Sequence, residues 1–236
     1  MIEYSLSFSS FKAHSAETIY RILRLPVMSK ILFPAYYYTD IGDTLIFENA
    51  DQIKLEDLSN EIEDELSFIL ILEGPGGLIF KISIHKLSGR ELVFPHMLSV
   101  RFSDLHFQVN DEFNLDILKT LFEEFVPIFN PHAGGLHQKN NSNTLRNNNI
   151  QHIFSTMIHG KPYQFELCWI SYCGSELLDF AGQERFGTLE SCLESYHLGD
   201  GMMLILQEEP YVDSNPKHRQ RFEALVNELR FKELWH

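Results

Sequence analysis

Apolar and polar side chains alternate along the first residues of the chain, which predicts a strand near Ile2–Ser9. The spacing then changes to that of a helix near Ser15–Leu25, in which Ile19, Ile22 and Leu23 share one face. A proline follows this helix directly, as is common after a helix end. The amino-terminal pattern is therefore strand, then amphipathic helix.

The next part of the chain predicts an antiparallel sheet. Two apolar runs flank the segment Glu73–Gly77, which holds three glycines and a proline, and this arrangement is typical of a hairpin. A third run would extend the hairpin into a sheet. The extended segments predicted here are Tyr36–Tyr38, Thr44–Phe47, Phe68–Leu72, Leu78–Ile84, Met97–Phe102 and, nearby, Phe107–Val109.

A second amphipathic helix is predicted after Asn114, a residue suited to capping a helix start. Beyond it, the segment 138–149 is rich in Asn, Ser and Thr and reads as a loop. We expect one α+β domain over residues 1–236, with mainly antiparallel sheets packed against a few amphipathic helices. The loop would join two possible lobes, 1–137 and 150–236.

The last third of the chain has the most specific pattern. An aromatic strand is expected around Trp169, and a glycine turn at Gly199–Gly201 precedes the apolar run Met202–Leu206, which predicts a buried strand. A helix should begin at Pro216, because proline suits the first helical position. The residue expected to cap this helix is Asn215 or Ser214, and its apolar stripe would be Phe222, Leu225, Val226 and Leu229.

This order of strands, glycine turn, Asn-Pro-x-His and terminal helix resembles that of bacterial polymorphic-toxin immunity proteins, most closely the immunity protein 52 family. The resemblance covers roughly Phe165–Leu234, and the matching positions are Trp169, Gly201, Asn215 and His218. These residue types serve the framework, since a Trp fills core volume, a Gly permits a turn, and Asn and His can satisfy backbone groups. None of them is an obvious catalyst.

The resemblance implies a role as a non-catalytic inhibitor. Such a protein binds a cognate antibacterial toxin protein, often a nuclease, and shields the producing cell during interbacterial competition. Type VI secretion is a candidate delivery system, and the sequence leaves the delivery system open. Neither a cofactor nor a metal is expected, and the oligomeric state is left open.

Charge narrows the kind of partner. The chain has 33 acidic and 19 basic residues, a formal charge of −14, so its field repels nucleic acid and anionic membranes and attracts cationic proteins. Solubility alone would also explain an acidic balance. No apolar run is long enough to span a membrane, and the three cysteines Cys168, Cys173 and Cys192 favour reduced thiols. We therefore expect a cytoplasmic protein that binds neither nucleic acid nor membrane directly.

One segment concentrates acids, with no basic residue between Glu56 and Glu65. It is either a solvated helix or loop, or a surface that mimics a phosphate backbone and steers a basic nuclease domain onto the inhibitor. A smaller cluster follows later in the chain. The predicted toxin-binding residues are Glu56, Asp57, Glu61, Glu63, Asp64 and Glu65, together with Asp111, Glu112 and Asp116.

Other motifs do not carry a function. The segment Asp179–Phe186 is similar to a GTPase switch, but the chain has no phosphate-binding glycine loop, and we expect a helix end and surface loop there. His132–Gly135 predicts a turn. An alternative function is a small hydrolase or small-molecule-binding domain that uses carboxylates with His85 or His96. A structural or assembly module is a third possibility.

Overall fold

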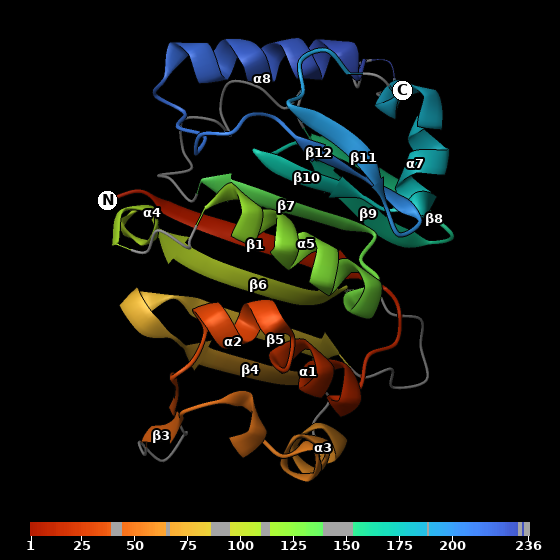
Figure 1. The fold of residues 1–236 in the computed structure, drawn as a ribbon. Coiled ribbons are helices and arrows are strands. Elements are labelled where there is room, and N and C mark those ends of the chain that lie inside the picture. Colours follow the sequence, from red (N-terminus) through yellow and green to blue (C-terminus); the bar gives the residue numbers. More distant parts are fainter. Residues whose placement is uncertain are drawn as a thin grey trace. The chain divides into compact units, whose positions relative to one another are not determined.

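The computed structural model describes residues 1–38, 44–64, 67–85, 95–109, 114–138, 153–187, 189–230 and 233. The chain has an α+β fold, as predicted, and every strand pair with a defined register is antiparallel. It divides into two compact units. The colours of Figure 1 follow the sequence from red at the amino terminus to blue at the carboxyl terminus. Unit 1 comprises Met1 and Ser9–Pro131, and unit 2 comprises Ile2–Phe8 and His132–His236.

Unit 1 is a sheet with helices on one side. Its strands follow the order β6-β5-β4-β2-β3, and Figure 1 shows α1 and α2 in front of β4 and β5. The elements are α1 (Ala16–Leu23), α2 (Pro26–Ile31), β2 (Ala35–Tyr38), β3 (Thr44–Phe47), the short 3-10 helix η1 (Ala50–Gln52), α3 (Leu55–Asp64), β4 (Ser67–Glu73), η2 (Pro75–Gly77), β5 (Ile79–His85), β6 (His96–Ser103), α4 (Leu105–Val109) and α5 (Leu115–Phe129).

The core of unit 1 follows from alternation in its strands. In β4, every second side chain is buried, and the same holds for the facing part of β5, because paired residues of an antiparallel ladder point to the same side. Helices α1, α2 and α5 supply the other half of this core with their apolar stripes. The buried side chains include Ile19, Ile22, Leu23, Val27, Met28, Phe68, Leu70, Leu72, Phe80, Ile82, Leu121 and Phe125.

The predicted elements of unit 1 are confirmed with one exception. Asn114 caps α5, and its side-chain oxygen accepts hydrogen bonds from the backbone N–H groups of Asp116 and Ile117. The expected strand at Phe107–Val109 is wrong, since these residues end helix α4. Local hydrogen bonds explain the difference, because the Ser103 N–H donates to Nδ1 of His106 at 3.3 Å and begins a turn there.

Unit 2 has a sheet of its own strands in the order β11-β12-β10-β7-β1, and a separate hairpin of β8 and β9. All residues of β10 and β12 are buried, and β12 confirms the predicted buried strand. The elements are β1 (Glu3–Ser10), β7 (Ala133–Gln138), β8 (Ile153–Ile158), β9 (Lys161–Glu166), β10 (Ile170–Cys173), α7 (Ser175–Ala181), η4 (Gln183–Phe186), β11 (Glu194–Leu198), β12 (Gly201–Ile205) and α8 (Pro216–Glu228).

The turn predicted at His132–Gly135 is wrong, because this segment enters the buried strand β7. Its glycines are needed for close packing between neighbouring segments. A Cβ atom on Gly134 would lie 2.4 Å from the ring of Phe8, and one on Gly135 would lie 2.7 Å from the sulfur of Cys168. The two glycines therefore make room for these side chains in the core of unit 2.

The loop predicted at 138–149 lies, apart from Gln138 at the end of β7, outside the described residues. The two units divide between Pro131 and His132, and unit 2 also takes Ile2–Phe8.

Candidate protein-binding surface

Helix α3 separates its apolar and acidic side chains. Leu58 and Ile62 are buried, whereas Glu56, Asp57 and Glu61 are exposed. Leu55, Leu58 and Ile62 are spaced three and four residues apart and form one apolar stripe, so the opposite face of the helix is left to solvent. Three of the predicted toxin-binding acids therefore occur on one exposed helix face.

The other predicted acids are distributed differently. Glu63 and Asp64 belong to α3, but their side chains lie outside the described residues, as do Glu65, Asp111 and Glu112 entirely. Asp116 lies in the first turn of α5, a different helix of unit 1, where it stabilises the helix start. Helix α1 packs against both α3 and α5.

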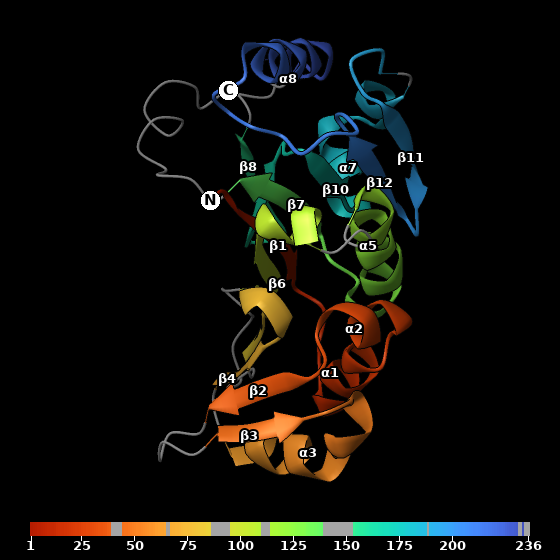
Figure 2. The same ribbon diagram turned by 60° about the vertical axis from the view of Figure 1, so that its left-hand side comes forward.

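Negative charge is concentrated around α3 far more than composition suggested. Residues 39–73 hold eleven acidic residues and one lysine, Lys54, so this stretch has a formal charge of −10 out of −14 for the whole chain. We call the described part that runs from β3 through η1 to α3, residues 44–64, the acidic edge. Figures 1 and 2 place β3 and α3 at the same end of unit 1.

Arg24, the residue that follows α1, lies beside the acidic edge. The guanidinium of Arg24 lies 3.7 Å from a carboxylate oxygen of Asp51, and it also donates to the backbone oxygen of Ile53 at 3.0 Å. Its planar group covers the ring of Tyr20 at 3.5 Å. The Asp51 side chain nevertheless remains 90% exposed, so this contact holds η1 in place and neutralises little of the surface charge.

Acidic residues occur along the whole of helix α3. Acids in the first turn, such as Glu56 and Asp57, are favoured by the positive end of the helix dipole. Glu61 lies beyond that turn, and the last turn of α3 contains no basic residue. The helix dipole therefore favours the acids of the first turn and not those near the carboxyl end.

The histidines of the alternative enzymatic hypothesis, His85 and the buried His96, lie near His14 in unit 1. The ring of His96 lies 5.0 Å from that of His14 and 6.3 Å from that of His85, and His14 stacks on Phe129 at 4.4 Å. Burial, reinforced by the neighbouring ring, lowers the pKa of His14 and of His96 to about 4. Both rings are therefore neutral at physiological pH.

The tautomer of His96 argues against a catalytic base. Its Nδ1 accepts a hydrogen bond from the backbone N–H of His85 at 3.0 Å, so the proton of the neutral ring is on Nε2. A general base needs a free lone pair on a ring nitrogen. Among the described residues, no group of three or more His, Cys, Asp or Glu side chains could hold a metal ion.

The four positions of the family resemblance all have contacts within unit 2. The indole N–H of Trp169 donates to the backbone oxygen of Gln207 at 2.8 Å, and the ring is buried in a connection before β10, not in a strand. A Cβ atom on Gly201 would lie 2.5 Å from the backbone oxygen of Cys173. Such a contact is too short, so the position requires glycine.

The remaining two positions order the start of α8. The side chain of Asn215 accepts a hydrogen bond from the N–H of Lys217 at 3.0 Å, and Pro216 occupies the first turn, which confirms the predicted cap. Nδ1 of His218 accepts from the N–H of Val212 at 3.0 Å. Asn215 thus satisfies a backbone N–H that the helix start leaves unpaired, and His218 satisfies one in the connection before the helix.

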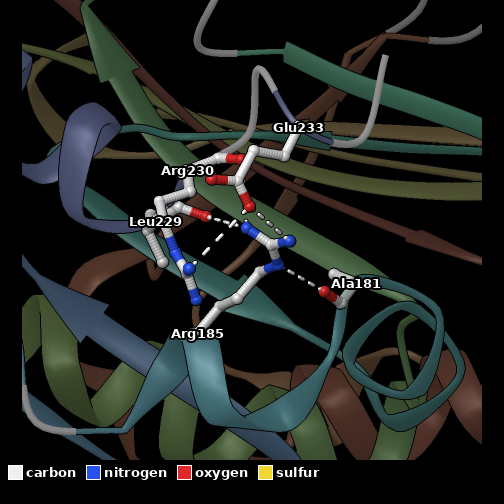
Figure 3. A network of polar contacts seen from close by, with 5 residues as sticks. All are labelled: Ala181, Arg185, Leu229, Arg230 and Glu233. Atoms are coloured by element: carbon white, nitrogen blue, oxygen red, sulfur yellow. Dashed lines mark hydrogen bonds and ion pairs between the residues drawn. The ribbon is translucent and has the colours of Figure 1, made fainter. Parts of the chain in front are cut away.

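The GTPase-like segment also serves the framework of unit 2. Figure 3 shows Arg185 of η4 between the end of α7 and the end of α8, where its guanidinium donates to the backbone oxygens of Ala181, Leu229 and Arg230. It also pairs with Glu233 at 3.0 Å. Phe186 is buried. The expected surface loop is thus a short 3-10 helix that holds the carboxy-terminal segment.

Comparisons with known proteins give a fold relationship. No family model matches the chain, and no curated protein sequence matches it. Among solved structures, the Pseudomonas aeruginosa T6SS protein PA0821 is similar, with a TM-score of 0.61 and 12% sequence identity over 98% of this chain and 74% of that one. At this identity, the likeness establishes a shared fold. No helix in the described ranges is long and apolar enough to cross a membrane.

Proposed function

We propose that this chain is an immunity protein that binds and neutralises a cognate toxin of a type VI secretion system. The acidic edge is the observation that carries the proposal, because residues 44–64 hold seven acidic residues and one lysine, within a stretch, residues 39–73, whose formal charge is −10. A surface of this kind fits a partner with a basic groove, and nucleases have such grooves for the phosphate backbone. The toxin is therefore proposed to be a nuclease.

Two further observations support the proposal. The fold is shared with a protein whose name assigns it to a T6SS. The carboxy-terminal motif resembles the immunity protein 52 family, and its residues are engaged in the framework of unit 2, as a non-catalytic scaffold would require.

The proposed mechanism is occlusion without chemistry. Acidic side chains of α3 take the place of phosphates along the substrate groove, and a protein interface of ordinary size then excludes the nucleic acid sterically. Long-range attraction speeds the encounter, and this contribution falls as salt screens the charges over about 10 Å.

Co-expression with the toxin encoded beside this gene tests the function. Cells that produce the active toxin should survive when this protein is present, and the two proteins should purify as a complex. In a matched control, an unrelated immunity protein replaces this chain in the cells that produce the toxin. Death of cells that contain soluble protein, or survival without any complex, would contradict the proposal.

A further inference from the structure

Two histidine rings of unit 1 each have one buried nitrogen that no protein group satisfies. These atoms are Nε2 of His14, in the segment between β1 and α1, and Nε2 of His96, the first residue of β6. Neither has a hydrogen-bond partner among the residues that the structure describes. Buried polar atoms are almost always hydrogen-bonded, because an atom that loses its bonds to water and gains no other destabilises the fold. The pair therefore points to a bound partner.

The hydrogen bonds of His96 fix the position of its proton. Its Nδ1 accepts the backbone N–H of His85 at 3.0 Å, so the lone pair of that nitrogen is in use. The ring is neutral at physiological pH, because burial lowers its pKa to about 4. A neutral imidazole carries one proton, which then lies on Nε2. The unsatisfied atom of His96 is thus a donor, on a residue that is only 2% exposed.

The ring of His14 has the opposite arrangement. Burial and the neighbouring His96 lower its pKa to about 4, and a hydrogen bond with the backbone of Phe129 opposes this shift. A hydrogen bond that raises the pKa of an imidazole is one that the ring donates. Since Nε2 has no partner, the donor is Nδ1. The Nε2 atom of this neutral ring therefore has its lone pair available and is an acceptor.

The separation of the two rings suits a bridge by one small molecule. Their centroids lie 5.0 Å apart, and the rings meet edge to face at 73°. No direct hydrogen bond joins the two Nε2 atoms. A water with two hydrogen bonds of about 2.9 Å can join atoms up to roughly 5.8 Å apart. It would accept one hydrogen bond and donate the other, which matches a donor on His96 and an acceptor on His14.

A metal ion does not suit this pair of atoms. A metal binds histidine through a nitrogen lone pair, whereas Nε2 of His96 carries the proton. To free that lone pair, the proton would have to move to Nδ1, and the hydrogen bond from the N–H of His85 would be lost. The chemistry of the two nitrogens therefore selects a neutral molecule that both donates and accepts.

We propose that unit 1 holds one buried water molecule, which accepts the Nε2–H of His96 and donates to Nε2 of His14. Such a water satisfies both nitrogens and holds each ring in one tautomer. It also connects the segment before α1 to the first residue of β6, so a polar contact joins the start of a helix to the sheet of unit 1. This water site does not depend on the proposed immunity function.

Nuclear magnetic resonance of the full chain with isotope-labelled histidines tests the site without any substitution. At neutral pH, proton–nitrogen spectra should show the Nε2–H tautomer for His96 and the Nδ1–H tautomer for His14. The Nε2 proton of His96 should also show cross-relaxation with a long-lived bound water. A crystal structure should place one water within about 3.2 Å of both Nε2 atoms.

Two substitutions separate a bridging water from ring packing. His14→Gln places an amide oxygen near the position of Nε2 and should retain the water signal of His96. His14→Phe keeps an aromatic ring on Phe129 but removes the acceptor, so this signal should be lost, because a buried water needs at least two polar partners. The control His197→Gln changes an exposed histidine of unit 2 and should leave the signal unchanged. Circular dichroism checks that each variant is folded.

Three results would overturn the water site. A nitrogen–nitrogen coupling between the two Nε2 atoms would show a direct hydrogen bond in its place. The Nδ1–H tautomer in His96 would remove the donor, and a missing water signal in the unmodified protein would remove the ligand. All three are read from the unmodified chain, so they stand even if a variant does not fold. None of them concerns toxin binding, which co-expression tests separately.

Discussion

Helices α3 and α8 use their polar residues in opposite ways. In α8, Asn215 and His218 accept backbone N–H groups, and a carboxylate oxygen of Glu228 accepts the N–H of Ser191 at 3.1 Å. In α3, Glu56 and Asp57 have no hydrogen bond or ion pair with any residue that the structure describes. The polar groups of α8 named here are thus engaged in the fold, whereas Glu56 and Asp57 of α3 are left to solvent.

Two arginines, one in each unit, also differ in how they use their charge. Arg185 makes hydrogen bonds to three backbone oxygens, and its side chain is only 12% exposed. Arg24 of unit 1 contacts an aspartate that stays almost fully exposed. The contacts of Arg185 join separate segments of unit 2, whereas the contact of Arg24 leaves the surface of unit 1 charged.

The largest expected effect comes from removing a framework residue. Trp169→Ala should lower the free energy of unfolding by about 3–5 kcal/mol, because it leaves a cavity and removes the donor to Gln207. Urea titration measures the loss. Trp169→Phe, which keeps much of the volume, should lose less than half as much. If Trp169→Ala weakened toxin binding per folded molecule but left stability unchanged, the division between framework and binding regions would be wrong.

The second effect concerns polar groups buried within unit 1. His14 and His96 have pKa values near 4, below the 6.5 of the unfolded chain. The unfolded state therefore takes up protons first, so their contribution to stability is complete above pH 6.5 and is lost as the pH falls towards 4. The urea midpoint should decrease over this range.

A substitution assigns this pH dependence. His14→Phe keeps the stacking on Phe129 and removes one titrating ring, so the decrease should become shallower. The control His197→Gln changes an exposed histidine of unit 2 and should leave the slope unchanged. If the urea midpoint decreased with pH equally in all three proteins, the two rings would not be buried in their neutral form.

The smallest effect on the fold is expected from the acids of α3. Glu56→Gln, Asp57→Asn and Glu61→Gln together should slow toxin association by about tenfold at low salt and flatten its salt dependence. The free energy of unfolding should change by no more than about 0.5 kcal/mol. Stopped-flow association at several salt concentrations provides the measurement.

A charge-matched control keeps this experiment specific. Glu190→Gln, Glu208→Gln and Glu223→Gln remove three charges from exposed positions of unit 2. Their association rate should change by less than about twofold. If both triple variants slow association equally, net charge alone steers the toxin, and α3 has no special role.

Much of the fold could be predicted from local pattern. The cap at Asn114, the cap at Asn215 and the buried run of β12 follow from residue types and spacing, and the structure confirms them. The strand predicted at Phe107–Val109 is wrong because a side-chain hydrogen bond of His106 begins a turn there. The turn predicted at His132–Gly135 is wrong because the conformation of this segment depends on side chains from distant parts of the chain.

The candidate surface was harder to predict. Acid-rich sequence identified α3, but the pattern could not show which acids are engaged elsewhere in the fold. Both alternating sets of positions in Ser67–Glu73 hold apolar residues. The run is therefore equally typical of a strand buried on both sides. Only the register shows that Ile69 and Ile71 face solvent.

The assignment of Ile2–Phe8 to unit 2 has a consequence for synthesis of the chain. This strand is synthesised before the rest of its unit, which begins at His132, more than 120 residues later. Closing so long a loop is slow compared with local contacts, so the first strand must wait for the carboxy-terminal half before it is paired within its unit. A nascent chain that stalls after Pro131 should therefore expose an apolar strand to chaperones, and splitting the gene at that boundary should yield no stable carboxy-terminal fragment.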